Sequence, residues 1–173
     1  MSAERRRIRA LTIIQPWAHL IAHGAKRVEN RTWEPTARGL AVGDYLAIHA
    51  GLSVDLACWD GAHEAMPREE APELVTLVEG AVFTVPARAR REFIRGLVPL
   101  GAVVAVARLA AVEDEAPDDD AYWCGPWGWR LDEVVAIEPV PCKGAQGLWE
   151  LPPDVYAMVR ERWAAKRGAV TRG

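Results

Sequence analysis

The amino-acid sequence predicts an α+β protein built on a small mixed β-barrel, with flanking helices and a helical insertion. The chain has 173 residues, half of them apolar, and this length suits one domain with a sizeable core. The strand-like segments are short and are separated by loops of uneven length. Helical segments interrupt the strands without alternating regularly with them, which favours a barrel over a doubly wound parallel sheet.

The first elements come early in the chain. The β-rich run LTIIQ at 11–15 predicts a strand. Proline suits the first turn of a helix and glycine suits its C-terminal end, so PWAHLIAHG predicts a short helix between Pro16 and Gly24. In RVENRTW, at 27–33, the alternation of residue types predicts a second strand.

The later segments add longer strands and one helical excursion. YLAIHA at 45–50 predicts a strand, and the proline-punctuated stretch at about 52–96 predicts a helical insertion. Both belong to a single domain that spans 1–173. Three further strands are then expected, at 101–112, at 127–141 and within 143–152. An amphipathic helix is expected after them, at 152–166.

Composition limits the classes of function. The net charge of −3 gives no broad basic field of the kind that many nucleic-acid binders carry. Cys58, Cys124 and Cys142 lie far apart without a C-x-x-C pair, which argues against a disulfide scaffold and a zinc site. No apolar run resembles a membrane span or a signal peptide, and no phosphate-loop or nucleophile-elbow motif occurs. We therefore expect a cytoplasmic protein with no metal, no cofactor and no membrane partner.

The polar segment HGAKRVENRTWEP, at 23–35, contains the candidate site residues. Glu29 and Arg31 are two positions apart, so on a strand they point to the same face. They would form either a solvated surface ion pair, worth under about 1 kcal/mol, or the wall of a cleft in which Arg31 keeps Glu29 ionised. Lys26 could contact a phosphate or a base carbonyl, or it could stabilise the C-terminal dipole of the preceding helix. The spacing alone leaves these alternatives open.

Tryptophan is unusually frequent, with eight residues. Its large ring and its N–H group favour partly buried positions and pocket walls. Trp17 and Trp33 could wall a cleft in which a base stacks, a contact worth about 1–3 kcal/mol, although core packing is at least as good an interpretation for Trp17. Trp127 and Trp129 share one face of a strand, and the sequence does not distinguish a core face from a groove.

Histidines are weaker candidates. His19 and His23 are four positions apart on the predicted helix, a spacing that can bind a metal. No third ligand is nearby, so two exposed histidines are the favoured interpretation. His49 ends an apolar strand, and there a hydrogen-bonded structural role is favoured over catalysis.

The order of these motifs resembles the ASCH domain family, named for homology to the activating signal cointegrator. The matching residues are QPWA at 15–18, a short helix, the G-x-K-x-x-E-x-R pattern of Gly24, Lys26, Glu29 and Arg31, then Trp33, Arg38-Gly39, YLAIHA, GPWGW at 125–129 and KGAQGLWELP at 143–152. The resemblance extends over nearly the whole chain and is loosest in the helical excursion.

This resemblance implies a PUA-like fold, in which helices flank a small β-barrel and a cleft lies beside the G-x-K-x-x-E-x-R segment. It also implies that the protein binds RNA, single-stranded nucleic acid or a modified nucleotide. The resemblance favours Lys26, Glu29 and Arg31 as ligand-binding residues, and with the possible aromatic walls they complete the predicted set of Trp17, Lys26, Glu29, Arg31 and Trp33. One bacterial branch is similar to amidohydrolases that act on N4-acylated cytidine and use a lysine, a threonine three positions later and a distant glutamate. Here Glu29 occupies the position of that threonine, so the threonine mechanism is not expected.

Two functions therefore remain open. The first is a binding module, for which a small pocket for one base or nucleotide agrees better with the net charge than a broad footprint. The second is a hydrolase, either a nucleoside amidohydrolase or a ribonuclease, with Glu29 as general base and Lys26 stabilising negative charge. Arg31 beside Glu29 would favour the ionised carboxylate and so oppose proton transfer. Binding is therefore the favoured prediction.

Overall fold

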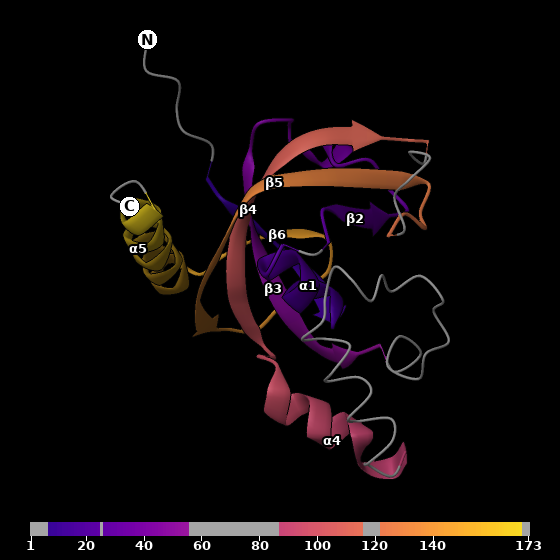
Figure 1. Cartoon of the computed structure of the whole chain (residues 1–173). Helices are drawn as coiled ribbons and strands as arrows, with labels where there is room; N and C mark the ends of the chain where they lie inside the picture. Colours follow the sequence, from indigo (N-terminus) through magenta and orange to yellow (C-terminus); the bar gives the residue numbers. More distant parts are fainter. Residues whose placement is uncertain (1–6, 25, 56–86, 116–121, 171–173) are drawn as a thin grey trace.

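A computed structural model of the chain describes residues 7–24, 26–55, 87–115 and 122–170. These residues form an α+β fold around a six-stranded sheet, with α1 and α5 on different sides of it (Figure 1). The elements follow in the order β1 (Arg9–Gln15), α1 (Trp17–Ala22), β2 (Val28–Arg31), η1 (Thr36–Arg38), β3 (Tyr45–Val54), α4 (Ala87–Leu97), β4 (Ala102–Glu113), β5 (Trp127–Pro141), β6 (Leu148–Glu150) and α5 (Pro153–Val170).

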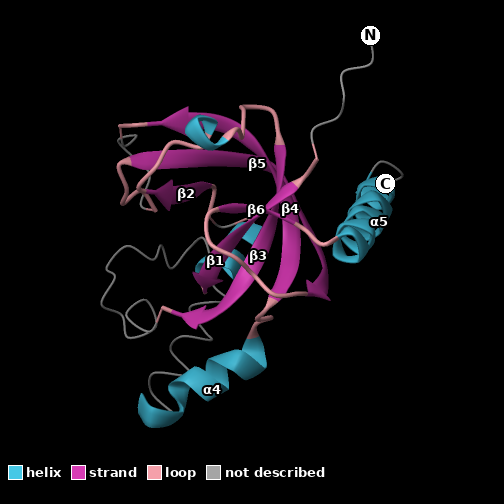
Figure 2. Ribbon diagram, turned by 180° about the vertical axis from the view of Figure 1, so that it is seen from behind, coloured by secondary structure: helices cyan, strands magenta, loops and turns pink. Residues whose placement is uncertain are grey.

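The sheet has the strand order β2-β5-β4-β3-β1-β6. Its neighbouring strands are antiparallel except β1 and β3, which are parallel. The long strands β4 and β5 pair with several register shifts, and such irregularities bend a strand and increase its twist. The sheet is therefore strongly curved, as Figure 2 shows.

The two ends of the curved sheet approach each other without pairing. β6 is three residues long and pairs only with Arg9–Leu11 of β1. On that side, none of the described strands pairs with β1 from Thr12 onward. Arg31 Nη2, at the end of β2, donates a hydrogen bond across the gap to the Thr12 carbonyl at 3.0 Å. The predicted α+β fold is confirmed, and its barrel is open along one line between β2 and β1, which we call the seam.

Apolar side chains cover both faces of the sheet. One cluster packs against α1 and contains the buried Leu11, Ile48 and Trp129. A second cluster lies against α5 and includes Val106. Trp127 packs against the first cluster beside Trp129, so the strand face that these two tryptophans share belongs to the core.

The predicted strands and helices lie near their expected positions among the described residues. β3 continues to Val54, into the range predicted for the insertion, because Val54 pairs with Gln15 of β1 and is buried. Residues 56–86 of the predicted insertion lie outside the described residues, and α4 covers its end. No helix in the described part of the chain is long and apolar enough to cross a membrane.

Candidate functional site

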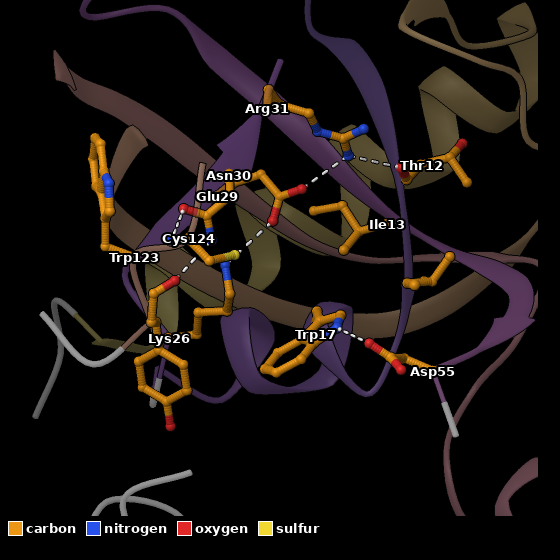
Figure 3. Close-up of a pocket in the computed structure, with 12 residues that line it drawn as sticks. Thr12, Ile13, Trp17, Lys26, Glu29, Asn30, Arg31, Asp55, Trp123 and Cys124 are labelled. Carbon is orange, nitrogen blue, oxygen red and sulfur yellow. Dashed lines mark hydrogen bonds and ion pairs between the residues drawn. The ribbon is translucent and has the colours of Figure 1, made fainter. Parts of the chain in front are cut away.

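A pocket of about 400 Å³ opens at the seam, where β1 and β2 face each other. Several separate parts of the chain contribute to its wall (Figure 3): Thr12–Ile14 of β1, Trp17 of α1, Lys26 and Glu29–Arg31 at β2, Asp55 after β3, and Tyr122–Cys124 before β5. Four of the five predicted ligand-binding residues line this pocket. Trp33 is not among its lining residues.

The turn between α1 and β2 buries Lys26. Gly24 adopts a φ of 84°, a left-handed conformation that suits glycine at the end of a helix. The Lys26 N–H donates to the Leu20 carbonyl at 3.2 Å, and the residue is only 3% exposed. Its ammonium group donates to the Val28 carbonyl and lies 3.4 Å from Glu29 Oε2. A phosphate would have to displace these partners to reach Lys26.

Glu29 lies between two cations. One carboxylate oxygen faces Lys26, and the other accepts from Arg31 Nη2 at 2.9 Å. Because Glu29 is 6% exposed, this is a buried charge cluster and not a solvated surface pair. Removing one member of such a cluster leaves an uncompensated buried charge, which typically costs about 3–5 kcal/mol. The sequence prediction that Glu29 and Arg31 share a face is thus confirmed.

Asn30 fixes the opposite wall of the pocket. Its Nδ2 donates to the Tyr122 carbonyl at 2.7 Å, and its Oδ1 accepts from the Cys124 N–H at 3.1 Å. The amide therefore uses both ends to hold the segment that precedes β5. Trp123, between these two contacts, lines the pocket.

A glycine provides the seat of the Trp123 ring. Gly128 is the register partner of Asn30 in the β2–β5 ladder. A Cβ atom at Gly128 would lie 1.7 Å from the Trp123 ring, so no other residue fits beneath the ring in this position. The sequence analysis did not identify Asn30 or Trp123. The glycine between the two tryptophans of GPWGW indicated a position where a ring could pack closely against the backbone. Only the strand register shows that this glycine lies opposite Asn30.

Trp17 forms another aromatic part of the wall. Its indole Nε1 donates to Asp55 Oδ2 at 3.1 Å, and the Asp55 N–H donates to the Gln15 carbonyl at 2.6 Å. Figure 3 shows the Trp17 and Trp123 rings well apart, with Lys26 and Glu29 between them in this view. The pocket thus presents two aromatic surfaces beside one charge cluster.

Trp33 has a different environment. Its ring packs edge-on against Trp129 with the centroids 4.7 Å apart, and it adjoins the core cluster. The Arg38 guanidinium lies 4.3 Å from the centroid of the Trp33 ring. The structure therefore places Trp33 between the core and an exposed arginine, away from the other predicted site residues.

The three described histidines lie outside this pocket. His19 and His23 stack with ring centroids 4.1 Å apart and border a second cavity of about 240 Å³. His19 is only partly exposed, contrary to the sequence prediction, and this burial, with the nearby His23 second, lowers its pKa to about 4. His49 is buried, and its Nε2 lies 3.1 Å from the Cys142 carbonyl. Burial also lowers the pKa of His49, as the expected structural role implies.

The polar groups of the pocket define its chemistry. Among the described residues, two cations and two carboxylates line it, so their formal charges sum to zero. Both Glu29 oxygens already face cationic donors. Among the described residues, no group of three or more His, Cys, Asp or Glu side chains is arranged to hold a metal ion. The pocket is suited to an uncharged flat group that stacks on indole rings and exchanges hydrogen bonds at its edge.

Comparisons with known proteins agree with this architecture. A family model, the ASCH domain, matches residues 11–116. Two crystal structures of an ASCH protein from Zymomonas mobilis resemble the chain, each with 13% sequence identity and a TM-score of 0.50. The first is a serine-to-alanine mutant, and its alignment covers 91% of this chain and 96% of the mutant chain. The alignment with the second structure covers 90% of this chain and 94% of the Zymomonas mobilis chain. At this identity the likeness concerns the fold alone. No curated protein matches the sequence.

Proposed function

The chain belongs to the ASCH domain family, and from this premise we propose that it is a binding module for RNA or a modified nucleotide. In this proposal the seam pocket accepts one base, which is unstacked from its neighbours. Protein modules that read single-stranded RNA commonly stack such splayed bases on aromatic side chains.

The observation that carries the proposal is the pairing of two tryptophans with a buried charge cluster in one pocket. Trp17 and Trp123 offer ring faces, and each is held in place by the contacts described above. Sites with pre-positioned aromatic groups bind at lower entropic cost, because fewer side chains need to be ordered. Asp55 and Asn30 line the pocket together with these rings, and the Asn30 amide, which already holds Tyr122 and Cys124, has a second N–H and a second lone pair.

The hydrolase alternative requires more rearrangement. Glu29 would have to accept a proton from water while both its oxygens face cations. Lys26 would have to leave the Val28 carbonyl to stabilise an oxyanion. The arrangement therefore supports binding better than acid–base chemistry.

The experiment that tests this proposal is nucleoside binding, measured by calorimetry with cytidine, adenosine, guanosine, uridine and N4-acetylcytidine. We expect at least one nucleoside to bind wild-type protein. Trp123→Ala should weaken its binding by roughly 5- to 150-fold, the equivalent of about 1–3 kcal/mol of stacking. Product analysis of the same mixtures by chromatography should show little or no deacylation.

Trp33→Phe is the matched control, because Trp33 does not line the pocket. It should leave nucleoside affinity unchanged. The proposal is wrong if no nucleoside binds, or if Trp33→Phe and Trp123→Ala have equal effects. Rapid deacylation of N4-acetylcytidine that disappears in Glu29→Gln would favour the hydrolase.

A further inference from the structure

The charge of the pocket raises the question of where a nucleic-acid backbone would be held. Lys26 and Arg31 are the cations among the described residues that line the pocket, and both are engaged with Glu29. Lys26 is also almost completely buried. An anionic phosphate gains little from cations that a carboxylate already neutralises, and burying it beside Glu29 would add repulsion. Backbone phosphates therefore need cations outside the pocket.

Arg9 and Arg38 have the properties that such a role requires. Arg9 Nη1 donates to the backbone carbonyl of Arg38 at 2.9 Å, which connects the start of β1 with η1. Neither arginine forms an ion pair with a carboxylate among the described residues. By contrast, the neighbouring Arg7 pairs with Glu150 at 3.5 Å.

The Arg38 side chain is also held in a defined position. It is exposed, yet its guanidinium stacks on the Trp33 ring at 4.3 Å, and such cation–π contacts restrict a flexible side chain. A Cβ atom at Gly147 would lie 3.0 Å from Arg38 Nη1, so the chain entering β6 passes close to this group. Stacking on one ring face leaves the edge of the planar guanidinium, with its N–H donors, for a bidentate contact with phosphate.

The two arginines lie beyond one end of the seam, because Arg9 belongs to the part of β1 that pairs with β6 and its side chain contacts Arg38. Arg31 contacts Thr12 across the seam, and Arg9 is three residues from Thr12 on β1, which corresponds to about 10 Å at the usual strand rise. On the other side of the seam the chain runs from Arg31 through Trp33 to Arg38. Strand β1 therefore connects the pocket, through Thr12, with the arginine pair, through Arg9.

We propose that Arg9 and Arg38 form a phosphate-binding site for the single-stranded RNA whose base enters the seam pocket. The inference rests on the proposed function, and it divides recognition into two parts. The pocket would select an uncharged base, and Arg9 with Arg38 would bind the backbone of the same strand. Sequence-independent affinity and its salt dependence should then come from the arginine pair.

The test uses fluorescently labelled homopolymeric RNA hexanucleotides of A, C, G and U, titrated against the full chain at several KCl concentrations. The test variant is Arg9→Gln with Arg38→Gln. We expect roughly tenfold or greater loss of hexanucleotide affinity at low salt. We also expect the slope of log affinity against log salt to become shallower by about 0.7 for each lost phosphate contact. Free-nucleoside affinity should not change.

The matched control is Arg95→Gln with Lys166→Gln, which removes two positive charges from exposed positions of α4 and α5. α4 lies away from β2 in both views of the fold (Figures 1 and 2). This control should keep the wild-type salt slope, and Arg9→Lys with Arg38→Lys should recover most of the affinity. Thermal unfolding checks that all variants are folded.

The outcomes separate the two proposals. A wild-type salt slope in the Arg9→Gln, Arg38→Gln protein overturns the phosphate site, even if nucleosides still bind the pocket. Equal losses in this variant and in the Arg95→Gln, Lys166→Gln control also overturn it, because the effect would then be one of net charge. Failure of wild-type protein to bind any hexanucleotide more tightly than its nucleoside overturns it as well. If no nucleoside binds, but Arg9→Gln with Arg38→Gln still lowers hexanucleotide affinity and the salt slope, the proposed base-binding role of the pocket is contradicted instead.

Discussion

At the residue scale, Glu29 is the carboxylate on which the geometry of the pocket depends. Lys26 approaches it from the turn after α1, and Arg31 approaches it from its own strand. Arg31 Nη2 in turn reaches the Thr12 carbonyl. A single anion thus determines where two cations lie and how β2 faces β1.

Glu29→Gln should therefore destabilise the protein much more than removal of a surface carboxylate. The amide keeps the shape of the side chain but leaves Lys26 buried without its counter-charge, and we expect a loss of about 3–5 kcal/mol in the free energy of unfolding. Urea denaturation measures this loss. The control is Glu150→Gln, because Glu150 is 68% exposed and pairs with Arg7 at the surface; it should cost less than about 1 kcal/mol. Similar losses in both variants would contradict the assignment of a buried charge cluster.

Gly128→Ala tests the seat of Trp123. The added methyl group would occupy the position of the indole ring, so Trp123 must move away from the pocket wall. Nucleoside affinity should fall by roughly 5- to 150-fold, as expected from the loss of one stacking partner. Gly96→Ala on α4 is a suitable comparison, because nothing lies within 4 Å of its added Cβ. Unchanged binding in Gly128→Ala, with the protein folded, would show that Trp123 does not contact the base.

At the scale of elements, α1 connects the pocket with the stacked rings of His19 and His23. The helix has only six residues, too few to be stable by itself. Its buried residues Leu20 and Ile21 pack against the sheet, and the Gln15 side chain accepts a hydrogen bond from the His19 N–H at 3.0 Å. Trp17 on this helix lines the pocket, while His19 on the same helix borders the second cavity.

The lowered pKa of His19 makes stability depend on pH in a defined direction. The folded pKa of about 4 lies below the usual value of 6.5, so between these values the unfolded chain binds more protons than the folded chain. Stability should thus fall as pH decreases from about 6.5 towards 4. Because the ring is partly exposed, solvent screening should limit this contribution to the order of 1 kcal/mol. Urea denaturation across this pH range measures it, and His19→Gln should flatten the profile relative to His23→Gln. An unchanged profile in His19→Gln would contradict the assignment.

At the scale of the whole molecule, the parts of the site that the sequence predicted are those that adjacent residues determine. Periodicity placed Glu29 and Arg31 on one face of a strand, and the structure confirms their contact. Trp123 could not be found in this way, because its place depends on the pairing of Asn30 with Gly128, 98 positions later in the chain. Trp33 was predicted to line the cleft. Strand β2 ends at Arg31, however, and the Trp33 ring packs against Trp129.

The sequence also did not predict that the barrel is open. Hydrophobic patterns indicated how many strands there are, but not that two of them are too short to meet. β6 pairs with only the first three residues of β1, and β2 has four residues. These lengths leave the edge of β1 uncovered from Thr12 onward and create the seam. The pocket therefore results from incomplete strand pairing, a property of the whole sheet.

If a side chain holds the seam together, removing that side chain should loosen both edges of the sheet. Arg31→Met keeps an unbranched side chain but loses the contacts with Glu29 and with the Thr12 carbonyl. We expect a loss of about 2–5 kcal/mol in the free energy of unfolding. Amide hydrogen exchange should become faster in Thr12–Ile14 and in β2, while the β4–β5 ladder should remain protected, because local opening exposes only the elements that the contact holds. Arg27→Met is the matched control, since Arg27 is exposed and forms no ion pair with a carboxylate among the described residues. Equal exchange rates at the seam in the two variants would mean that backbone packing, and not Arg31, keeps β2 opposite β1.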